Sequence, residues 1–231
     1  MSESATISGS GFFLTLAAFI MLLLIVPAAS AAGRRIKPGW RAWVWPLFFG
    51  CLALTGLFSS LAAAFSTDNL ASLSWKIVNL MAGLSFTFLT LNTLYRAFSD
   101  ELARRLAPLI WVVYLVFAIA VLAFTSFVPV LVYDAVCSIL VFLTHSTLYA
   151  HNRDRNIDAR HIMVGTGLIL LADLVASFQF NFSFGPLSFN QLLPYDLLQI
   201  AALIFFYMGA SASYSLKYDK QRSQERALMR N

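Results

Sequence analysis

The chain has 231 residues, of which 59% are hydrophobic and 12% charged, and it contains 21 Phe and 5 Trp. An average soluble domain is about half apolar and a quarter charged, so we expect lipid to be the main solvent of this chain. The composition excludes disordered, collagen-like and disulfide-stapled proteins. The net charge of +5 does not indicate a nucleic-acid partner, because the basic residues lie in loops that flank apolar segments.

Seven apolar segments are each long enough to cross the ~30 Å hydrocarbon layer of a membrane. We therefore predict an all-α fold, a seven-helix transmembrane bundle, with spans at 11–32, 43–66, 75–95, 109–126, 129–149, 161–180 and 195–216. Pro108, Pro129 and Pro194 are predicted in first helical turns, where the missing N–H has no cost.

The basic residues predict the orientation of the bundle. All 16 Lys and Arg except Lys76 lie in the segments 34–41, 96–105, 153–160 and 217–230, which share one side of the membrane. By the positive-inside rule the N-terminus is outside and the C-terminus cytoplasmic. We expect one transmembrane domain, 1–216, and a basic tail, 217–231, in a multi-pass protein of a cell membrane, a bacterial inner membrane. The first span is expected to stay in the membrane rather than be cleaved, because its flanking charges are the reverse of a signal peptide's.

Ionisable side chains inside a span are costly and therefore indicate function. Three carboxylates qualify, those of Asp134, Asp173 and Asp196, and all are predicted in the outer halves of their spans. Other polar residues recur at helical spacing on five spans: Thr55 and Ser59; Asn79, Thr87 and Thr90, with Gly83 on the same face; Ser138 and His145; Thr166, Ser177 and Asn181; and Gln199. These stripes should face the bundle interior, which predicts a polar cavity that opens outward.

The predicted ligand-binding or ion-binding residues are Asp173, Asp134, Asp196, Gln199, Asn79, Ser177, Ser59 and His145. Asp173 is the central candidate, because it lies closest to the middle of a span, where a carboxyl is either protonated or holds a cation or proton. Asp196 and Asp134 lie near enough to water for a capping role instead. A single histidine such as His145 is also typical of a packed, hydrogen-bonded residue.

Other patterns have structural interpretations. Ser, Thr and Asn in spans often only tie helices together, and the small pair Gly209…Ser213 indicates close helix packing. Cys51 and Cys137 are expected to be free thiols. Two histidines, His151 and His161, and two acids, Asp154 and Asp158, lie near the loop after the fifth span. We expect the two acids to pair with the arginines of the same loop, which are Arg153, Arg155 and Arg160. We predict no metal site, no cofactor and no catalytic residue.

Two segments carry a resemblance to a known family: Gly56-Leu57-Phe58-Ser59-Ser60, and Asn190 with Asp196-x-x-Gln199. With them the chain resembles small bacterial proteins related to the alkaline ceramidase and progestin-receptor-like (CREST) superfamily of membrane hydrolases. The resemblance implies a serine and a histidine in the second helix, an aspartate in the third and paired histidines in the seventh. Ser59 matches the serine, but the second span has no histidine, the third has Asn79 and no aspartate, and Gln199 stands where a histidine is expected. The resemblance thus implies a lipid hydrolase whose zinc site is lost.

Three functions remain open. The first is a small-molecule binder or a proton-coupled or cation-coupled transporter that uses the outer cavity. The second is a CREST-like lipid hydrolase, active or degenerate. The third is a non-catalytic membrane subunit or interaction protein whose polar stripes only pack helices. The expected partners are the lipid bilayer and a small-molecule or lipid ligand, with no nucleic acid, and the oligomeric state is left open.

Overall fold

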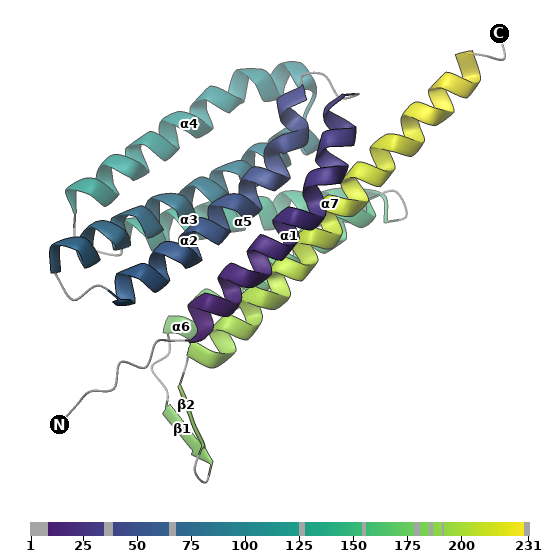
Figure 1. Ribbon diagram of the computed structural model, residues 1–231. Helices are drawn as coiled ribbons and strands as arrows, with labels where there is room; N and C mark the ends of the chain where they lie inside the picture. The colour runs from purple at the N-terminus through teal and green to yellow at the C-terminus, as the bar shows by residue number, and fades with distance from the viewer. Residues whose placement is uncertain are drawn as a thin grey trace, which may run out of the picture.

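The computed structural model describes residues 9–34, 39–64, 68–124, 128–153, 156–177, 181–184, 187–190 and 192–228. Within these residues there are seven α-helices: α1 (Gly9–Gly33), α2 (Val44–Ala64), α3 (Asp68–Ala97), α4 (Asp100–Ala123), α5 (Val128–His151), α6 (Ile157–Ser177) and α7 (Leu192–Leu228). Each helix runs back along the one before it, and α7 ends at the opposite end of the bundle from the start of α1 (Figure 1). The predicted all-α bundle of seven helices is confirmed.

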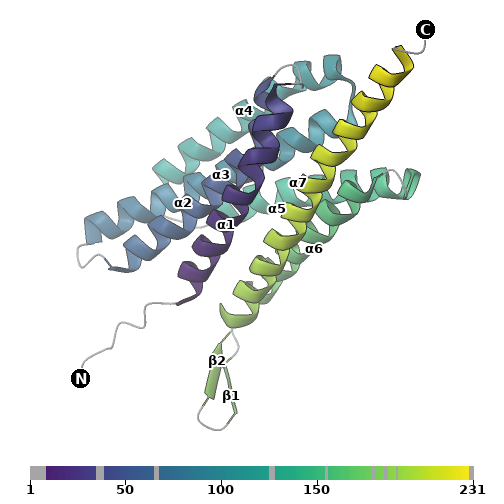
Figure 2. The ribbon, with the colours of Figure 1, turned by 45° about the vertical axis from the view of Figure 1, so that its right-hand side comes forward.

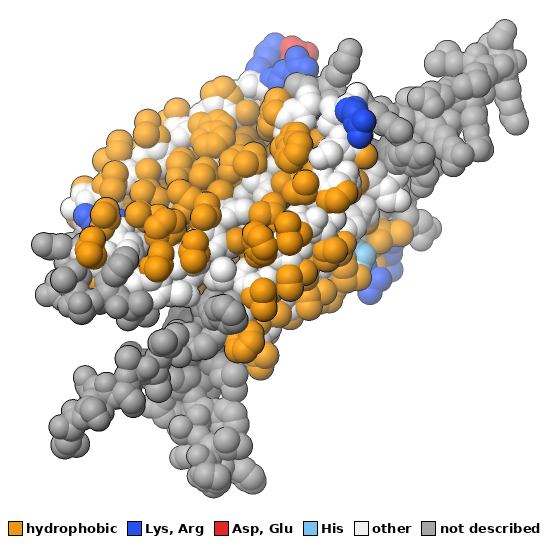
Figure 3. Space-filling view, viewed as in Figure 1, with side chains coloured by type: hydrophobic (Ala, Val, Ile, Leu, Met, Phe, Trp, Pro, Cys, Tyr) orange, Lys and Arg blue, Asp and Glu red, His pale blue; other side chains and the backbone are white. Residues whose placement is uncertain are grey.

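Six of the seven helices in the described part of the chain, all but α6, are long and apolar enough to cross a membrane. The helix α6 carries Asp158, Arg160 and Asp173, and it packs along α7 and beside α5 (Figure 2). Apolar side chains cover the middle of the visible face, while the visible Lys and Arg gather near its ends (Figure 3). On α4, Leu115 and Val116 are 58% and 63% exposed. This distribution is that of a bundle whose outer surface faces lipid, and which end faces the cytoplasm stays a prediction.

Several helices begin before the apolar spans predicted from the sequence. The helix α4 begins at Asp100, where the Ser99 side chain accepts a hydrogen bond from the Leu102 N–H and caps the first turn. Acidic residues in that turn also favour a helix start. Pro108 therefore lies inside α4, and its predicted place in a first turn was wrong. Pro129 and Pro194 lie in the first turns of α5 and α7, as predicted.

Three short elements of the described residues lie outside the seven helices. A 3-10 helix, η1 (Gly39–Trp43), precedes α2. Between α6 and α7, strands β1 (Asn181–Phe184) and β2 (Leu187–Asn190) pair antiparallel, with Asn181 opposite Asn190. This hairpin projects beyond the helices at the end where α7 begins (Figure 1), and it was not predicted from the sequence.

The helices α6 and α7 pack closely because small residues lie between them. A Cβ added to Gly209 would lie 2.8 Å from Ile162 Cγ1 and 3.3 Å from the Asp158 carbonyl oxygen. A Cβ added to Gly165 would lie 3.1 Å from the Phe206 ring. The close packing predicted from Gly209 and Ser213 is therefore present.

The seventh helix continues past the membrane span. Its apolar part covers Pro194–Ser215, but the helical backbone runs without a break to Leu228. Figure 1 shows this last part extending beyond the bundle. Most of the predicted basic tail is thus a direct extension of α7.

Candidate functional site

A cavity of about 440 Å³ lies among the helices of the bundle. Five helices contribute its polar lining residues: Thr55 and Ser59 from α2, Asn79 from α3, Asp134 from α5, Asp173 from α6, and Tyr195, Asp196 and Gln199 from α7. Six of the eight residues predicted as a binding site therefore line one cavity. They come from sequence positions as distant as Ser59 and Gln199, so only the packing of the bundle brings them together.

Of the other two predicted residues, only His145 has a described side chain, and His145 does not line the cavity. The side chain of Ser177 lies outside the described residues. His145 is fully buried elsewhere, and its Nε2 lies 3.1 Å from the Thr93 hydroxyl of α3. A histidine packed between two helices in this way fits the structural interpretation of His145 rather than the ligand one.

On three of the helices the lining residues change from polar to apolar with depth. Along α7, Asp196 and Gln199 come first and Leu203 and Phe206 follow. The helix α3 has the same order, from Asn79 near its start to Phe86 further on. The helix α2 runs the other way, and its order is reversed, with Phe48 and Leu52 before Thr55 and Ser59. The polar groups therefore gather toward the end of the bundle where α7 begins, which we call the cavity end.

Aromatic rings close the deep side of the cavity. The rings of Phe48 and Phe206 meet edge to face, with centroids 5.2 Å apart. Phe49 and Trp45 pack behind Phe48, and all four side chains are at most 2% exposed. We call these four residues the aromatic floor. It separates the cavity from the opposite end of the bundle.

The carboxyl groups of the cavity are near one another. Those of Asp134 and Asp173 interact electrostatically, and Tyr195 lies within electrostatic reach of these two and of Asp196. The Oδ1 atom of Asp134 is buried and accepts no hydrogen bond from the described residues. A buried oxygen of this kind is costly unless it receives a donor, such as a proton, a water molecule or a cationic ligand.

The opposite end, which we call the basic end, is held by ion pairs. Arg96 of α3 donates to both carboxylate oxygens of Asp158 on α6, at 2.9 and 3.2 Å, and to Asn156 at 2.8 Å. The Ser213 hydroxyl of α7 donates to the same carboxylate, at 3.3 Å. Asp158 is 1% exposed, so this is a buried contact of three helices. The expected pairing of Asp158 with the loop arginines was wrong; Asp154 and Arg155 lie outside the described residues.

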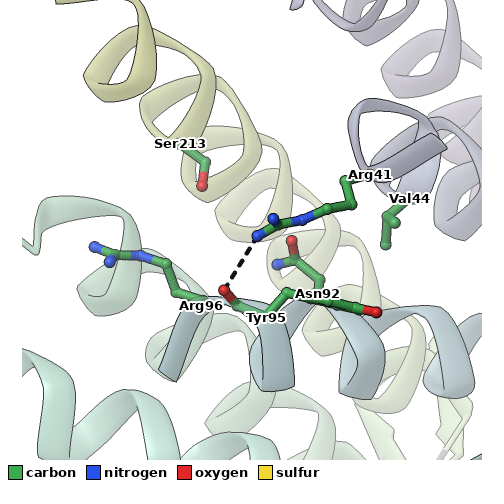
Figure 4. Close-up of a pocket in the computed structure, with 6 residues that line it drawn as sticks. All are labelled: Arg41, Val44, Asn92, Tyr95, Arg96 and Ser213. Atoms are coloured by element: carbon green, nitrogen blue, oxygen red, sulfur yellow. Dashed lines mark hydrogen bonds between the residues drawn. The ribbon is translucent and has the colours of Figure 1, made fainter. Parts of the chain in front are cut away.

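A second arginine ties η1 to α3 and α4 at the basic end. Arg41 donates to Asp100 at 2.8 Å and to the Tyr95 carbonyl oxygen at 3.3 Å, and it lies over the Tyr95 ring. Figure 4 shows Arg41 and Asn92 lining a small pocket, with Arg96 pointing away from Arg41. This pocket measures about 30 Å³, the space of one water molecule, so it is too small for a ligand.

Part of the polar pattern predicted as cavity lining holds helices together instead. Thr87 of α3 and Tyr133 of α5 share a hydrogen bond of 2.7 Å. Tyr133 also stacks on Phe117 of α4, with ring centroids 4.3 Å apart. Thr87, which was predicted on the polar face of α3, therefore joins α3 to α5 rather than lining the cavity. Such contacts are expected for hydroxyl groups in transmembrane bundles.

Sequence reasoning missed the five aromatic residues of the described lining, which are Phe48, Trp75, Phe86, Tyr195 and Phe206. Trp75 and Tyr195 resemble ordinary interfacial anchors in the sequence, but both line the cavity. The spacing of Tyr195 and Gln199, one helical turn apart, was a usable signal that both share a face of α7.

Metal binding has no support from the described residues, among which no three His, Cys, Asp or Glu side chains are arranged to hold a metal ion. Ser59, the residue that matches the serine implied by the resemblance to the CREST superfamily, lines the cavity. The hydrolase hypothesis stays a prediction, and stoichiometric zinc in purified protein would support it.

The family model of DUF6962, a family of unknown function, matches residues 11–215, which cover α2 to α6 and most of α1 and α7, and the chain belongs to that family. No curated protein and no solved structure matches the chain.

Proposed function

We propose that this member of the DUF6962 family binds a small molecule or a cation in the cavity, from the membrane side that the cavity end faces. The observation that carries the proposal is the convergence of three carboxyl groups from α5, α6 and α7 on one cavity of about 440 Å³. Small-molecule sites are typically cavities of about 300–1,000 Å³ with a few convergent polar groups. Ionisable groups within a membrane bundle are costly and therefore mark binding sites or ion pathways.

The proposal extends to transport of the bound ligand. The charge pattern predicts that the cavity end faces the outside. The aromatic floor lies between the cavity and the basic end, and the Arg96–Asp158 contact lies at the basic end itself. A protein that opens these two layers after loading the cavity would release its ligand on the other side of the membrane.

A non-catalytic packing role is the second candidate, and a specific observation favours it. The Thr87–Tyr133 and Thr93–His145 contacts show that polar groups of α3 and α5 are used to join helices. If the cavity carboxyls have the same role, a neutral amide of the same shape should replace each of them without loss.

The test is Asp173→Asn, which keeps shape and hydrogen bonding but removes ionisation. The variant should insert and unfold thermally like the wild type. It should lose the stabilisation that cations or small cationic molecules give the wild type between about pH 5 and pH 8, measured as the shift of the unfolding midpoint. Asp100→Asn is the matched control, because Asp100 is an exposed carboxylate at the basic end. Equal ligand responses of Asp173→Asn and the wild type over this range would overturn the proposal in favour of packing.

A further inference from the structure

The cavity has a chemical polarity along its length. Its polar lining lies at the cavity end, and its deep part is lined by Phe48, Leu52, Phe86, Leu203 and Phe206. The gradient recurs on α2, α3 and α7, whichever way each helix runs. From Asp196 to Phe206 the cavity follows α7 for about 15 Å, at 1.5 Å per residue. A ligand that fills this space has a polar group at one end and an apolar group at the other.

The charge of the polar group follows from the lining. Among the described lining residues three are aspartates and none is Lys, Arg or His. The carboxyl groups of Asp134 and Asp173 are close enough to interact, so a bound cation would relieve the repulsion between their charged forms. The rings of Trp75 and Tyr195 also line this part and can face a cation. Carboxylates repel an anionic headgroup or a fatty acid.

The buried Oδ1 of Asp134 selects among cations. It has no donor among the described residues, so it requires one from the ligand or from water. An ammonium group with N–H bonds supplies a donor and a metal ion coordinates the oxygen directly, whereas a quaternary ammonium group does neither. The apolar floor, in turn, makes a small hydrated cation a poor occupant, because such an ion leaves uncovered the deep apolar part of the cavity, about 10 Å along α7 from Gln199 to Phe206.

We infer that the ligand of this cavity is an amphipathic amine, with its ammonium group at Asp134 and Asp173 and its apolar group on the aromatic floor. The inference rests on the proposed function and narrows it to one chemical class. Neither the family match nor the resemblance to membrane hydrolases implies such a ligand.

The first experiment uses the wild-type protein in neutral detergent and four probes that differ in the head group. Phenylbutylamine should bind, measured by calorimetry and by the shift of the thermal unfolding midpoint. Phenylbutanol, phenylbutanoate and the N,N,N-trimethyl derivative of the amine should each bind at least about tenfold more weakly, because each lacks the charge or the N–H donors.

Two variants locate the two ends of the ligand. Asp134→Asn should weaken phenylbutylamine about tenfold or more and leave phenylbutanol unchanged. Ala82→Leu adds bulk to the apolar wall between Asn79 and Phe86, so it should weaken phenylbutylamine and leave methylamine unchanged. Both variants are first compared with the wild type for their unfolding midpoint, and the head-group series does not depend on either of them.

The outcomes separate the two claims. If phenylbutanoate or phenylbutanol binds as well as the amine, or if only Na⁺, K⁺ or protons stabilise the protein, the amine inference is overturned and the binding function stands. Equal binding of the trimethyl derivative overturns the role of the Asp134 oxygen and with it the inference. If no amine, alcohol, carboxylate or inorganic cation has any effect on the folded wild type, both claims fall.

Discussion

The two ends of the bundle are built from the same kinds of residue but use them differently. At the basic end, Arg96, Asp158 and Ser213 bond directly to one another across three helices. At the cavity end, Asp134, Asp173 and Asp196 converge from three helices on an open space. A charged residue in a membrane bundle therefore has two distinct structural meanings. A residue paired with an opposite charge holds helices together. Residues of the same charge around a cavity destabilise the fold, and a bound ligand of opposite charge offsets that cost.

The largest expected difference between the two ends is the compartment that each faces. A reporter enzyme that is active only in the cytoplasm should be active when it is fused after Asn231. A tag placed before Ser2 should be accessible from outside the cell. The expectation follows from the fifteen of 16 basic residues that share one side. An extracellular reporter at the C-terminus would reverse the two ends and place the cavity mouth on the cytoplasmic side.

Removal of the central cation of the basic end should strongly destabilise the fold. Arg96→Met leaves the carboxylate of Asp158, which is 1% exposed, without its ion pair, and we expect a loss of about 3 kcal/mol in the free energy of unfolding. Denaturant unfolding in detergent measures this loss.

Arg105→Met is the matched control for Arg96→Met. The pair of Arg105 with Glu101 is exposed at both partners, so the change should stay within about 0.5 kcal/mol. Equal effects of the two substitutions would show that the Arg96–Asp158 contact does not hold the basic end.

Glycine substitution should distinguish tight from loose packing. Gly209→Ala places a Cβ against Ile162 and the Asp158 carbonyl, and overpacking of this kind costs about 1–3 kcal/mol. Gly50→Ala in α2 meets only Leu22, at 3.9 Å, so it should be neutral or stabilise by about 0.5–1 kcal/mol through lower chain entropy. The unfolding midpoints of the two variants should therefore move in different directions.

A Thr→Val pair gives the smallest and most direct comparison. Thr93 and Thr55 both donate to the carbonyl four residues earlier in their own helices. Thr93 also contacts His145 of α5, so Thr93→Val should cost about 1 kcal/mol. Thr55 lines the cavity, and Thr55→Val should leave stability unchanged within about 0.5 kcal/mol. A larger loss for Thr55→Val would mean that the cavity end is held by its polar groups after all.

The sequence predicts this fold well because each span needs only about 20 apolar residues with its basic residues in the flanking loops. A length of apolar residues and a distribution of Lys and Arg are local properties, so the number of helices and their alternation follow without knowledge of the packing. Helix ends follow less well. The Asp100–Ala107 part of α4 is too polar to count as a span, yet Ser99 and the acids after it start a helix there. The β1–β2 hairpin carries a pattern that was missed, because polar and apolar residues alternate in Asn181–Phe184 and Leu187–Asn190 on both sides of a Gly-Pro turn sequence.

The sequence predicts which residues of each helix face the bundle interior, but it does not predict which residues of other helices they meet. Helical spacing places Asp173, Asn79 and Gln199 on inward faces, and these residues line one cavity. Spacing alone does not tell which inward polar group meets another helix and which meets empty space. That is why Thr87 and His145, on the same stripes, are contacts between helices, and why Asp158 pairs with Arg96, 62 positions away in the sequence.

The unbroken helix α7 gives the protein a mechanical property that its other helices lack. Its first turns carry Asp196 and Gln199 in the cavity wall, and its far end at Leu228 extends beyond the bundle. At 1.5 Å per residue the helix is about 55 Å long, so a rigid tilt of about 5° around its cavity end would displace the other end by about 5 Å. A helix of this length would act as a lever arm, in which a small change of angle at the cavity becomes a displacement of side-chain size at the other end of the bundle.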